Sequence, residues 1–340
     1  MSARLRPRAT PERAARMQDV AQAAGVSMVT VSRALNEPDK LAPATLAAVR
    51  AAIDQLRYVH NLTAGSLASK RTRIVAAVVP TIASSIFSDT IDGLSKVMAR
   101  HRYQLLLGQT QYRQEEEAQL IDAFLGRRVD GVVLTGVVHA RGVRARLQRA
   151  GIPVVETWDL TTRPIDMVVG FSNRAAGEAA ARYLAGKGHR ALAFIGGIDE
   201  RSAARLEGFR AGAKAAGAGA VVDEIVASPS AVADGSQALL RLLQNAPSTR
   251  AIFCTNDMLA AGVLFECQRQ GIAVPQRMAV MGFADLPIAA GIEPALTSVQ
   301  VRSTEMGQRA GELLMRRLDK QPEPERIVDL GFEVVERASA

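Results

Sequence analysis

The feature that most limits the possible folds is a regular alternation of short apolar segments with longer amphipathic ones after Arg73. Each short segment has the length of a buried strand, and each longer one carries apolar residues at helical spacing. Strands that alternate with helices in this way form doubly wound parallel sheets, and such sheets bind ligands beyond the carboxyl ends of their strands. The pattern therefore predicts an α/β fold.

These segments fall into two groups, which predict two lobes with a cleft between them. In the first lobe we expect strands at 74–79, 103–108, 130–135, 154–156 and 167–170, and helices near 87–101, 114–127 and 141–150. In the second we expect strands at 191–196, 221–226, 251–254, 279–282 and near 327–335, and helices near 174–188, 203–216, 232–245 and 257–271.

The stretch Met17–Asn36 precedes these lobes and has the pattern of two short helices joined by a turn. Gly25 suits the left-handed conformation that such a turn needs, and Ser27 is placed to cap a second helix over 28–35. A helix-turn-helix of this kind presents its second helix to the DNA major groove. A helical hairpin that binds no DNA is the alternative for this stretch taken alone.

The charge distribution favours DNA. Residues 1–73 carry twelve Lys and Arg against five Asp and Glu, so that +7 of the chain's net charge of +8 lies there. A basic end on a nearly neutral body suits a polyanion, because each neutralised phosphate releases counterions. Residues 1–16 on their own read as a basic disordered arm.

Composition excludes several other classes of protein. The chain has 340 residues, of which 48% are hydrophobic, and no apolar run reaches the roughly 18 residues of a membrane span. Its arginine-rich start lacks the apolar core of a secretory signal. Cys254 and Cys267 are expected to be buried free thiols, which together predict a cytoplasmic protein. No His and Cys cluster has metal-ligand spacing, so we expect no metal and no cofactor.

An enzymatic active site is not expected. Gly196 and Gly197 follow a strand, but no complete phosphate-binding motif surrounds them. His101, His139 and His189 have no evident Ser or Cys partner. A sensor cleft accounts for the body without catalysis.

A third predicted helix at Pro43–Leu56, with Tyr58 after it, completes a longer pattern. The matching motifs are Asp19-Val20-Ala21, Ala24-Gly25-Val26-Ser27, Thr30-Val31-Ser32-Arg33, Leu56-x-Tyr58 and the segment Asn61 to Ala68. With them, the chain resembles the lactose-repressor (LacI-type) family of bacterial transcription regulators over roughly residues 17–335.

This resemblance implies a domain organisation. It comprises a helix-turn-helix domain at 17–60, a hinge helix at 61–73, and a two-lobed body of the periplasmic-binding-protein fold at 74–340. Lobe 1 is expected at about 74–157 and 288–322, and lobe 2 at about 163–285 and 325–336. Three crossing segments are then expected near 157–166, 284–297 and 320–326.

The resemblance also implies the DNA contacts. From the second helix and its ends they are Ser27, Met28, Val29, Thr30, Ser32, Arg33 and Asn36, and from the hinge Asn61, Ala64, Leu67 and Ala68. Leu67 matches a leucine that relatives wedge into the minor groove, with a disordered linker as the alternative. A palindromic operator requires a homodimer.

For the effector, the resemblance implies contacts from Ser84, Ser85, Phe87, Trp158, Arg205, Asn256 and Asp285. Phe87 is equally well explained as a core residue at the start of a helix, and Asp257 as a helix cap. Ala284 and Trp158 stand where many relatives carry an acid that binds sugar hydroxyls. Losing those acids while keeping Arg205 favours a negatively charged effector.

Several stretches are most similar to the gluconate-repressor subgroup of this family. They are 79–87, 151–159, 169–173 and 253–257. We therefore expect a repressor that a sugar acid, gluconate or a keto or phospho derivative, releases from its operator. The alternative is a sugar-binding or sugar-modifying protein with an incidental basic N-terminus.

Overall fold

The computed structural model describes residues 15–59, 71–82, 85–322 and 325–340, without the side chains of Asn36 and Ser85. The chain divides into two compact units, residues 1–72 and 73–340. The predictions made for the arm up to residue 14 and for Asn61, Ala64, Leu67, Ala68 and Ser84 lie outside the described residues.

The first unit contains the predicted helix-turn-helix and the third helix. Its helices are α1 (Met17–Ala23), α2 (Met28–Asn36), the 3-10 helix η1 (Pro38–Lys40) and α3 (Pro43–Leu56). Val20, Val31 and Val49, one from each α-helix, are completely buried and form the centre of a small core. Gly25 has a φ of +65° between α1 and α2, which confirms the predicted left-handed turn.

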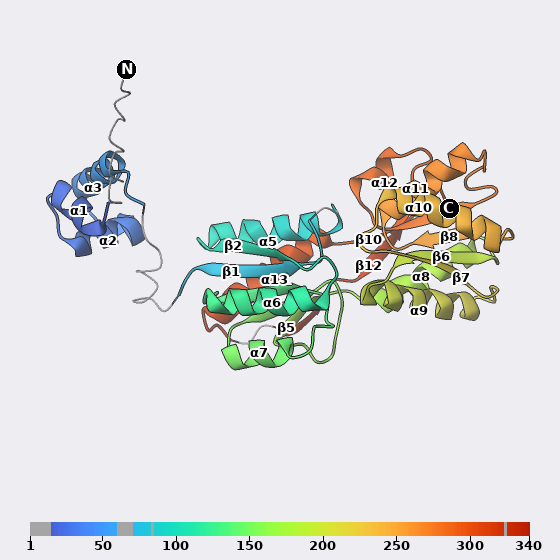
Figure 1. The fold of residues 1–340 in the computed structure, drawn as a ribbon, viewed down its shortest axis with the longest axis horizontal. Helices are drawn as coiled ribbons and strands as arrows, with labels where there is room; N and C mark the ends of the chain where they lie inside the picture. Colours follow the sequence, from blue (N-terminus) through green and yellow to red (C-terminus); the bar gives the residue numbers. More distant parts are fainter. Residues whose placement is uncertain (1–14, 60–70, 83–84, 323–324) are drawn as a thin grey trace, which may run out of the picture. The chain divides into compact units, whose positions relative to one another are not determined.

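Lobe 1 of the second unit is a six-stranded parallel sheet with the order β11-β5-β4-β3-β1-β2. Helices α5 and α13 cover one face, and α6 and α7 cover the other (Figure 1). The strands are β1 (Ile74–Val79), β2 (Gln104–Gln109), β3 (Gly131–Thr135), β4 (Val154–Thr157), β5 (Met167–Gly170) and β11 (Ile327–Asp329). The helices are η2 (Ser85–Phe87), α5 (Ser88–Arg100), α6 (Gln114–Gly126), α7 (Val143–Ala150) and α13 (Ser303–Leu318).

Lobe 2 has a second six-stranded sheet with the order β12-β10-β9-β8-β6-β7, in which β12 alone is antiparallel to its neighbour. Helices α8 and α9 lie against one face, and α10 and α11 against the other. The strands are β6 (Leu192–Gly197), β7 (Val222–Val226), β8 (Ala251–Cys254), β9 (Ala279–Ala284), β10 (Thr297–Val301) and β12 (Phe332–Val335). The helices are α8 (Asn173–Gly186), α9 (Glu200–Ala215), α10 (Val232–Asn245), α11 (Asp257–Arg269) and α12 (Pro287–Gly291).

The predicted crossing segments at 157–166, 284–297 and 320–326 are wrong. Strand β5 pairs with β4 in lobe 1, and β10 pairs with β9 in lobe 2. The stretch 327–335, expected as one strand of lobe 2, contains β11 of lobe 1 and β12 of lobe 2. The chain therefore crosses after Gly170, after Val301 and after Asp329.

The lobe limits expected from those crossings move accordingly. Residues 163–170 fell within lobe 2 by those limits but belong to lobe 1, as the strand prediction for 167–170 had it. Residues 288–301, expected in lobe 1, belong to lobe 2. An apolar strand has the same local pattern whichever sheet it extends. Only the long-range pairing decides which lobe it joins.

A row of buried aromatic rings runs through the junction of the lobes. The ring centroids of Phe87 and Trp158 are 5.1 Å apart, those of Trp158 and Phe171 6.1 Å, and those of Phe171 and Phe283 5.9 Å. Phe87 and Trp158 belong to lobe 1, Phe171 to the first crossing and Phe283 to lobe 2. The two lobes therefore share one continuous apolar core.

Candidate DNA-reading helix and effector cleft

Helix α2 presents the expected DNA-contacting side chains to solvent. Met28 is 53% exposed and Val29 is 68% exposed, and Arg33 is also exposed. Ser27 caps the helix, since its Oγ accepts a hydrogen bond from the Thr30 amide at 3.1 Å. Ser27 Oγ also lies 3.0 Å from the Thr30 hydroxyl. With Val31 buried on the opposite side, the helix has one face for the core and one open to a partner.

A cleft of 170 Å³ lies between the lobes at the carboxyl ends of the lobe 1 strands. This is the edge at which parallel α/β sheets bind ligands. Lobe 1 contributes the ends of β1, β2 and β3 and the start of α6, and lobe 2 contributes the start of α9. The lining residues are Val78, Val79, Pro80, Thr110, Tyr112, Arg113, Gln114, Glu117, Thr135, Val138, Ile198, Asp199, Glu200 and Arg201.

Two hydrogen bonds cross this cleft. Arg201 Nη1 of lobe 2 donates to the carbonyl of Thr135 in lobe 1 at 3.4 Å. Gln114 Nε2 of lobe 1 donates to Glu200 Oε1 of lobe 2 at 3.2 Å. Because both bonds join one lobe to the other, their lengths depend on how far the cleft is open.

Arg205 is a buried cation on α9, 5% exposed. Its Nη1 donates to the side-chain oxygen of Asn173, and its guanidinium carbon lies 4.3 Å from the centroid of the Phe283 ring. Desolvation lowers the pKa of Arg205 to about 10, with nearby Asp199 opposing the shift, so the side chain is charged at neutral pH. Its Nε has no hydrogen-bond partner among the described residues.

An unsatisfied N–H on a buried arginine is costly unless a ligand or water satisfies it. Ser202 Oγ, three residues earlier on α9, is also buried without a partner among the described residues. Both atoms are buried, and neither Arg205 nor Ser202 is among the residues that line the 170 Å³ cleft. Their unused hydrogen-bonding capacity and the charge of Arg205 suit an anionic group.

Tyr112 is a cleft residue that the sequence analysis missed. Burial raises the pKa of its hydroxyl, and Arg201, Asp199 and Arg205 are all close enough to affect that pKa. Thr110 and Tyr112 follow within three residues of the end of β2, and Thr135 is the last residue of β3, so all three lie at strand ends. The rule that ligands bind beyond the ends of parallel strands could have identified Tyr112 from the sequence.

Two predicted effector residues are buried in the core. Phe87 is 4% exposed and Trp158 is 1% exposed. The indole Nε1 of Trp158 donates to Thr90 Oγ1 at 3.1 Å. The Phe87 ring also lies 5.6 Å from the guanidinium carbon of the cleft residue Arg201. The contact of these two rings with an effector stays a prediction.

The helix cap that the sequence suggested for Asp257 is supplied by Asn256 instead. Asn256 is the helix cap, since its Oδ1 accepts from the Leu259 amide at 2.8 Å. Asp257 accepts instead from the Ser298 hydroxyl and the Leu286 amide, each at 2.6 Å. Burial raises its pKa to about 7 against those hydrogen bonds.

The carboxylate of Asp285 interacts with two side chains of lobe 2. Its carboxylate lies 2.6 Å from Arg337 Nη1 and accepts from Gln300 Nε2 at 2.8 Å. The Asp285 side chain is 7% exposed. Each carboxylate oxygen thus has a protein partner, and the contact of Asp285 with an effector stays a prediction.

A buried triad of Glu117, His139 and Glu156 supports the lobe 1 wall of the cleft. His139 Nδ1 lies 2.7 Å from Glu117 Oε1, and Nε2 lies 3.0 Å from Glu156 Oε1. Burial on its own would lower the pKa of His139, but hydrogen bonds to the two carboxylates outweigh it and raise the pKa to about 9. Among the described residues, no group of three His, Cys, Asp or Glu side chains is arranged to hold a metal ion.

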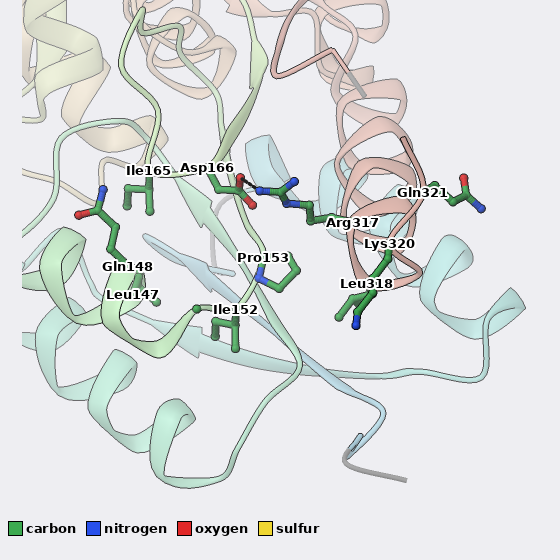
Figure 2. A pocket seen from close by; sticks show the side chains of 11 residues that line it. Leu147, Gln148, Ile152, Pro153, Ile165, Asp166, Arg317, Leu318, Lys320 and Gln321 are labelled. Atoms are coloured by element: carbon green, nitrogen blue, oxygen red, sulfur yellow. Dashed lines mark ion pairs between the residues drawn. The ribbon is translucent and has the colours of Figure 1, made fainter. Parts of the chain in front are cut away.

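A larger hollow of 640 Å³ lies at the other edge of the lobe 1 sheet. Figure 2 shows it between α7 and α13, with Arg317 directed at Asp166. Their ion pair measures 3.3 Å. The hollow contains none of the predicted effector residues that the structure describes, and it lies at the amino ends of the strands.

Comparisons with known proteins agree with these features. Residues 16–61 match the model of the bacterial regulatory proteins of the lacI family, and residues 181–340 match that of the periplasmic binding protein-like domain. The chain is 37% identical over 325 residues to the HTH-type transcriptional regulator GntR of Pseudomonas aeruginosa, which covers 95% of each chain. It is 32% identical over 317 residues to GntR of Escherichia coli, covering 93% of this chain and 96% of that one.

A solved structure resembles the whole chain. It is a transcriptional regulator of the LacI family from Silicibacter pomeroyi, 33% identical, with a TM-score of 0.88 over 96% of this chain and 99% of that one. A helix-turn-helix head and a two-lobed body with a cleft define a DNA-binding transcriptional regulator, not an enzyme. The chain belongs to the LacI family of bacterial transcriptional regulators.

In the described parts of the chain, no helix combines the length and the apolar character needed to cross a membrane.

Proposed function

We propose that this regulator is a homodimeric repressor that binds a palindromic operator in the cytoplasm and releases it when a sugar acid fills the cleft. The proposed effector is gluconate or a keto or phospho derivative. The observation that supports a sugar-acid effector is the state of Arg205. It is a buried cation whose Nε has no hydrogen-bond partner, and no carboxylate among the described residues forms an ion pair with it. An effector carboxylate would supply both the hydrogen-bond acceptor and the negative charge that Arg205 lacks.

For DNA reading, the proposal rests on the exposed face of α2. Met28 and Val29 cannot donate hydrogen bonds, so they read thymine methyl groups, while Arg33 reads a guanine. Ser27, Thr30 and Ser32 supply further contacts from the same helix. Asn36, Asn61, Ala64, Leu67 and Ala68 complete the proposed set, in which Leu67 enters the minor groove.

In the effector cleft, Arg205 holds the carboxylate and hydroxyl-bearing side chains hold the sugar hydroxyls. Tyr112, Thr110 and Thr135 line the cleft and are suited to this role. Ser84, Ser85 and Asn256 are also proposed to form hydrogen bonds with the sugar hydroxyls.

A ligand changes DNA affinity only through different affinities for two lobe arrangements. The bonds that cross the cleft, from Arg201 to Thr135 and from Gln114 to Glu200, are the contacts that such a change would alter. We therefore expect the filled and empty cleft to differ in these two bonds.

The test is Arg205→Ala, studied by calorimetry with gluconate, ketogluconates and phosphogluconate, and by binding to DNA from the protein's own locus. The variant should keep operator binding and lose release by the effector. Arg210→Ala is the matched control, because Arg210 is exposed on the same helix and pairs with Asp223. This control should respond to the effector as the parent does.

The effector half fails if no member of the panel binds the parent protein, or if a ligand tightens the DNA complex. The oligomeric half fails if sedimentation shows a stable monomer.

A further inference from the structure

The amino-terminal edge of the lobe 1 sheet is strongly basic. It consists of the last helical turn and the connection before each of β1, β2, β3, β4 and β11, which end at one edge because these strands are parallel. The exposed arginines and lysines there are Arg73, Arg100, Arg102, Arg127, Arg128, Arg149, Arg316, Lys320 and Arg326. Among the described residues, the acids of this edge are the exposed Asp319 and Glu325, the buried Asp130 before β3, and Asp166 before β5, which pairs with Arg317.

Attraction to helix dipoles explains a part of this charge. Basic side chains are favoured near helix C-termini, and three of these arginines donate to a carbonyl of their own helix. Arg100 donates to the Lys96 carbonyl, Arg127 to that of Ala123 and Arg149 to that of Ala145. The dipole does not account for Arg73 and Arg326, which lie directly before strands and outside any helix.

The basic residues of this edge are exposed to solvent. Arg100, Arg127 and Arg149 are all exposed, and each is hydrogen-bonded to backbone, not to a carboxylate. Summed positive charge of this kind attracts a polyanion from solution. Arg73, the residue directly before β1, is part of this edge.

We propose that this edge is a second DNA-binding surface, which contacts the phosphate backbone without reading sequence and adds to the affinity that the helix-turn-helix supplies. The partner is double-stranded DNA, recognised by its phosphates. The inference rests on DNA binding by the head, but it assigns part of the electrostatic affinity to the body.

The test removes three positive charges from this edge of lobe 1 and, in a control protein, three positive charges from lobe 2. The DNA affinities of the two variants are then compared. The variant is Arg100→Gln, Arg127→Gln and Arg149→Gln together. The control is Arg190→Gln, Lys214→Gln and Arg250→Gln, which removes the same charge from exposed residues before strands of lobe 2. Arg190 and Arg250 likewise donate to backbone carbonyls.

Affinity for a labelled duplex of random sequence is measured by anisotropy over a series of KCl concentrations. Each phosphate contact contributes about 0.9 to the slope of log affinity against log salt, so the lobe 1 variant should lose about one to three from that slope. The control should keep the parent's slope. Replacing the same three lobe 1 arginines with lysine should also keep it, which separates charge from folding.

Equal slopes for the parent and the lobe 1 variant would overturn the inference. So would an equal loss in both triple variants, because net charge alone would then explain it. Neither result affects the proposed function, whose DNA-binding part fails if the parent itself does not bind DNA.

Discussion

Replacing His139 with Leu should destabilise the body by leaving two buried carboxylates without their shared cation. Glu156 is fully buried, and the side chains of Glu117 and His139 are 11% and 5% exposed. Removing one member of a buried ion pair costs about 3–5 kcal/mol. The His139 pKa gives a similar figure, because the difference between about 9 and the ordinary value of 6.5 corresponds to about 3 kcal/mol.

The pH dependence of this contribution has a definite sign. The folded state holds the His139 proton more tightly than the unfolded state, so the stabilisation is complete below pH 6.5 and is lost as the pH rises through about 9. The assay is urea unfolding followed by circular dichroism across this pH range. His139→Leu should lower the free energy of unfolding at pH 6 and remove its decline toward pH 10.

His101→Gln is the control, because His101 is an exposed histidine at the end of α5. It should leave both the free energy and its pH dependence unchanged. A His139→Leu protein that unfolds with the parent's free energy at pH 6 would refute the argument that the triad is a charged, stabilising unit.

Three further changes test the head and the packing of lobe 2. Substituting Met28 and Val29 together should change the sequence recovered in a binding-site selection more than it changes overall affinity; recovery of the parent's site would contradict base reading by these side chains. Ser27→Ala should destabilise the head by about 1 kcal/mol in thermal unfolding, because it removes the cap of α2. Gly208→Ala should cost at least about 1–3 kcal/mol in urea unfolding, since its Cβ would lie 1.8 Å from a backbone carbonyl oxygen of α8. Gly186→Ala, with nothing within 4 Å of the added carbon, should cost nothing.

Local patterns predicted the elements of this fold well. The helix expected at 43–56 begins and ends where the structure has it, because Pro43 suits a first helical position and the apolar stripe continues to Leu56. The strand at 74–79 and the helix at 232–245 also agree. In each case one short window of sequence contains the whole signal.

Features that depend on contacts between distant residues could not be predicted from the sequence. The lobe limits were misplaced around 163–170 and 288–301, and 327–335 was read as one strand, because hydrogen bonding between distant strands does not appear in the local sequence pattern. His139 was dismissed for lack of a partner, yet Glu117 and Glu156, which are 22 and 17 residues away, are its partners. Arg205 was identified through its motif, whereas Tyr112 in the cleft carried no motif of its own.

The row of aromatic rings at the lobe junction contains an intrinsic fluorescent probe. Trp158 is the single tryptophan of the chain, and it lies between Phe87 of lobe 1 and Phe171 of the first crossing. Its indole environment therefore depends on the packing at the junction of the lobes. Intrinsic fluorescence excited at this one residue should follow lobe movement directly, with no label attached and no background from a second tryptophan.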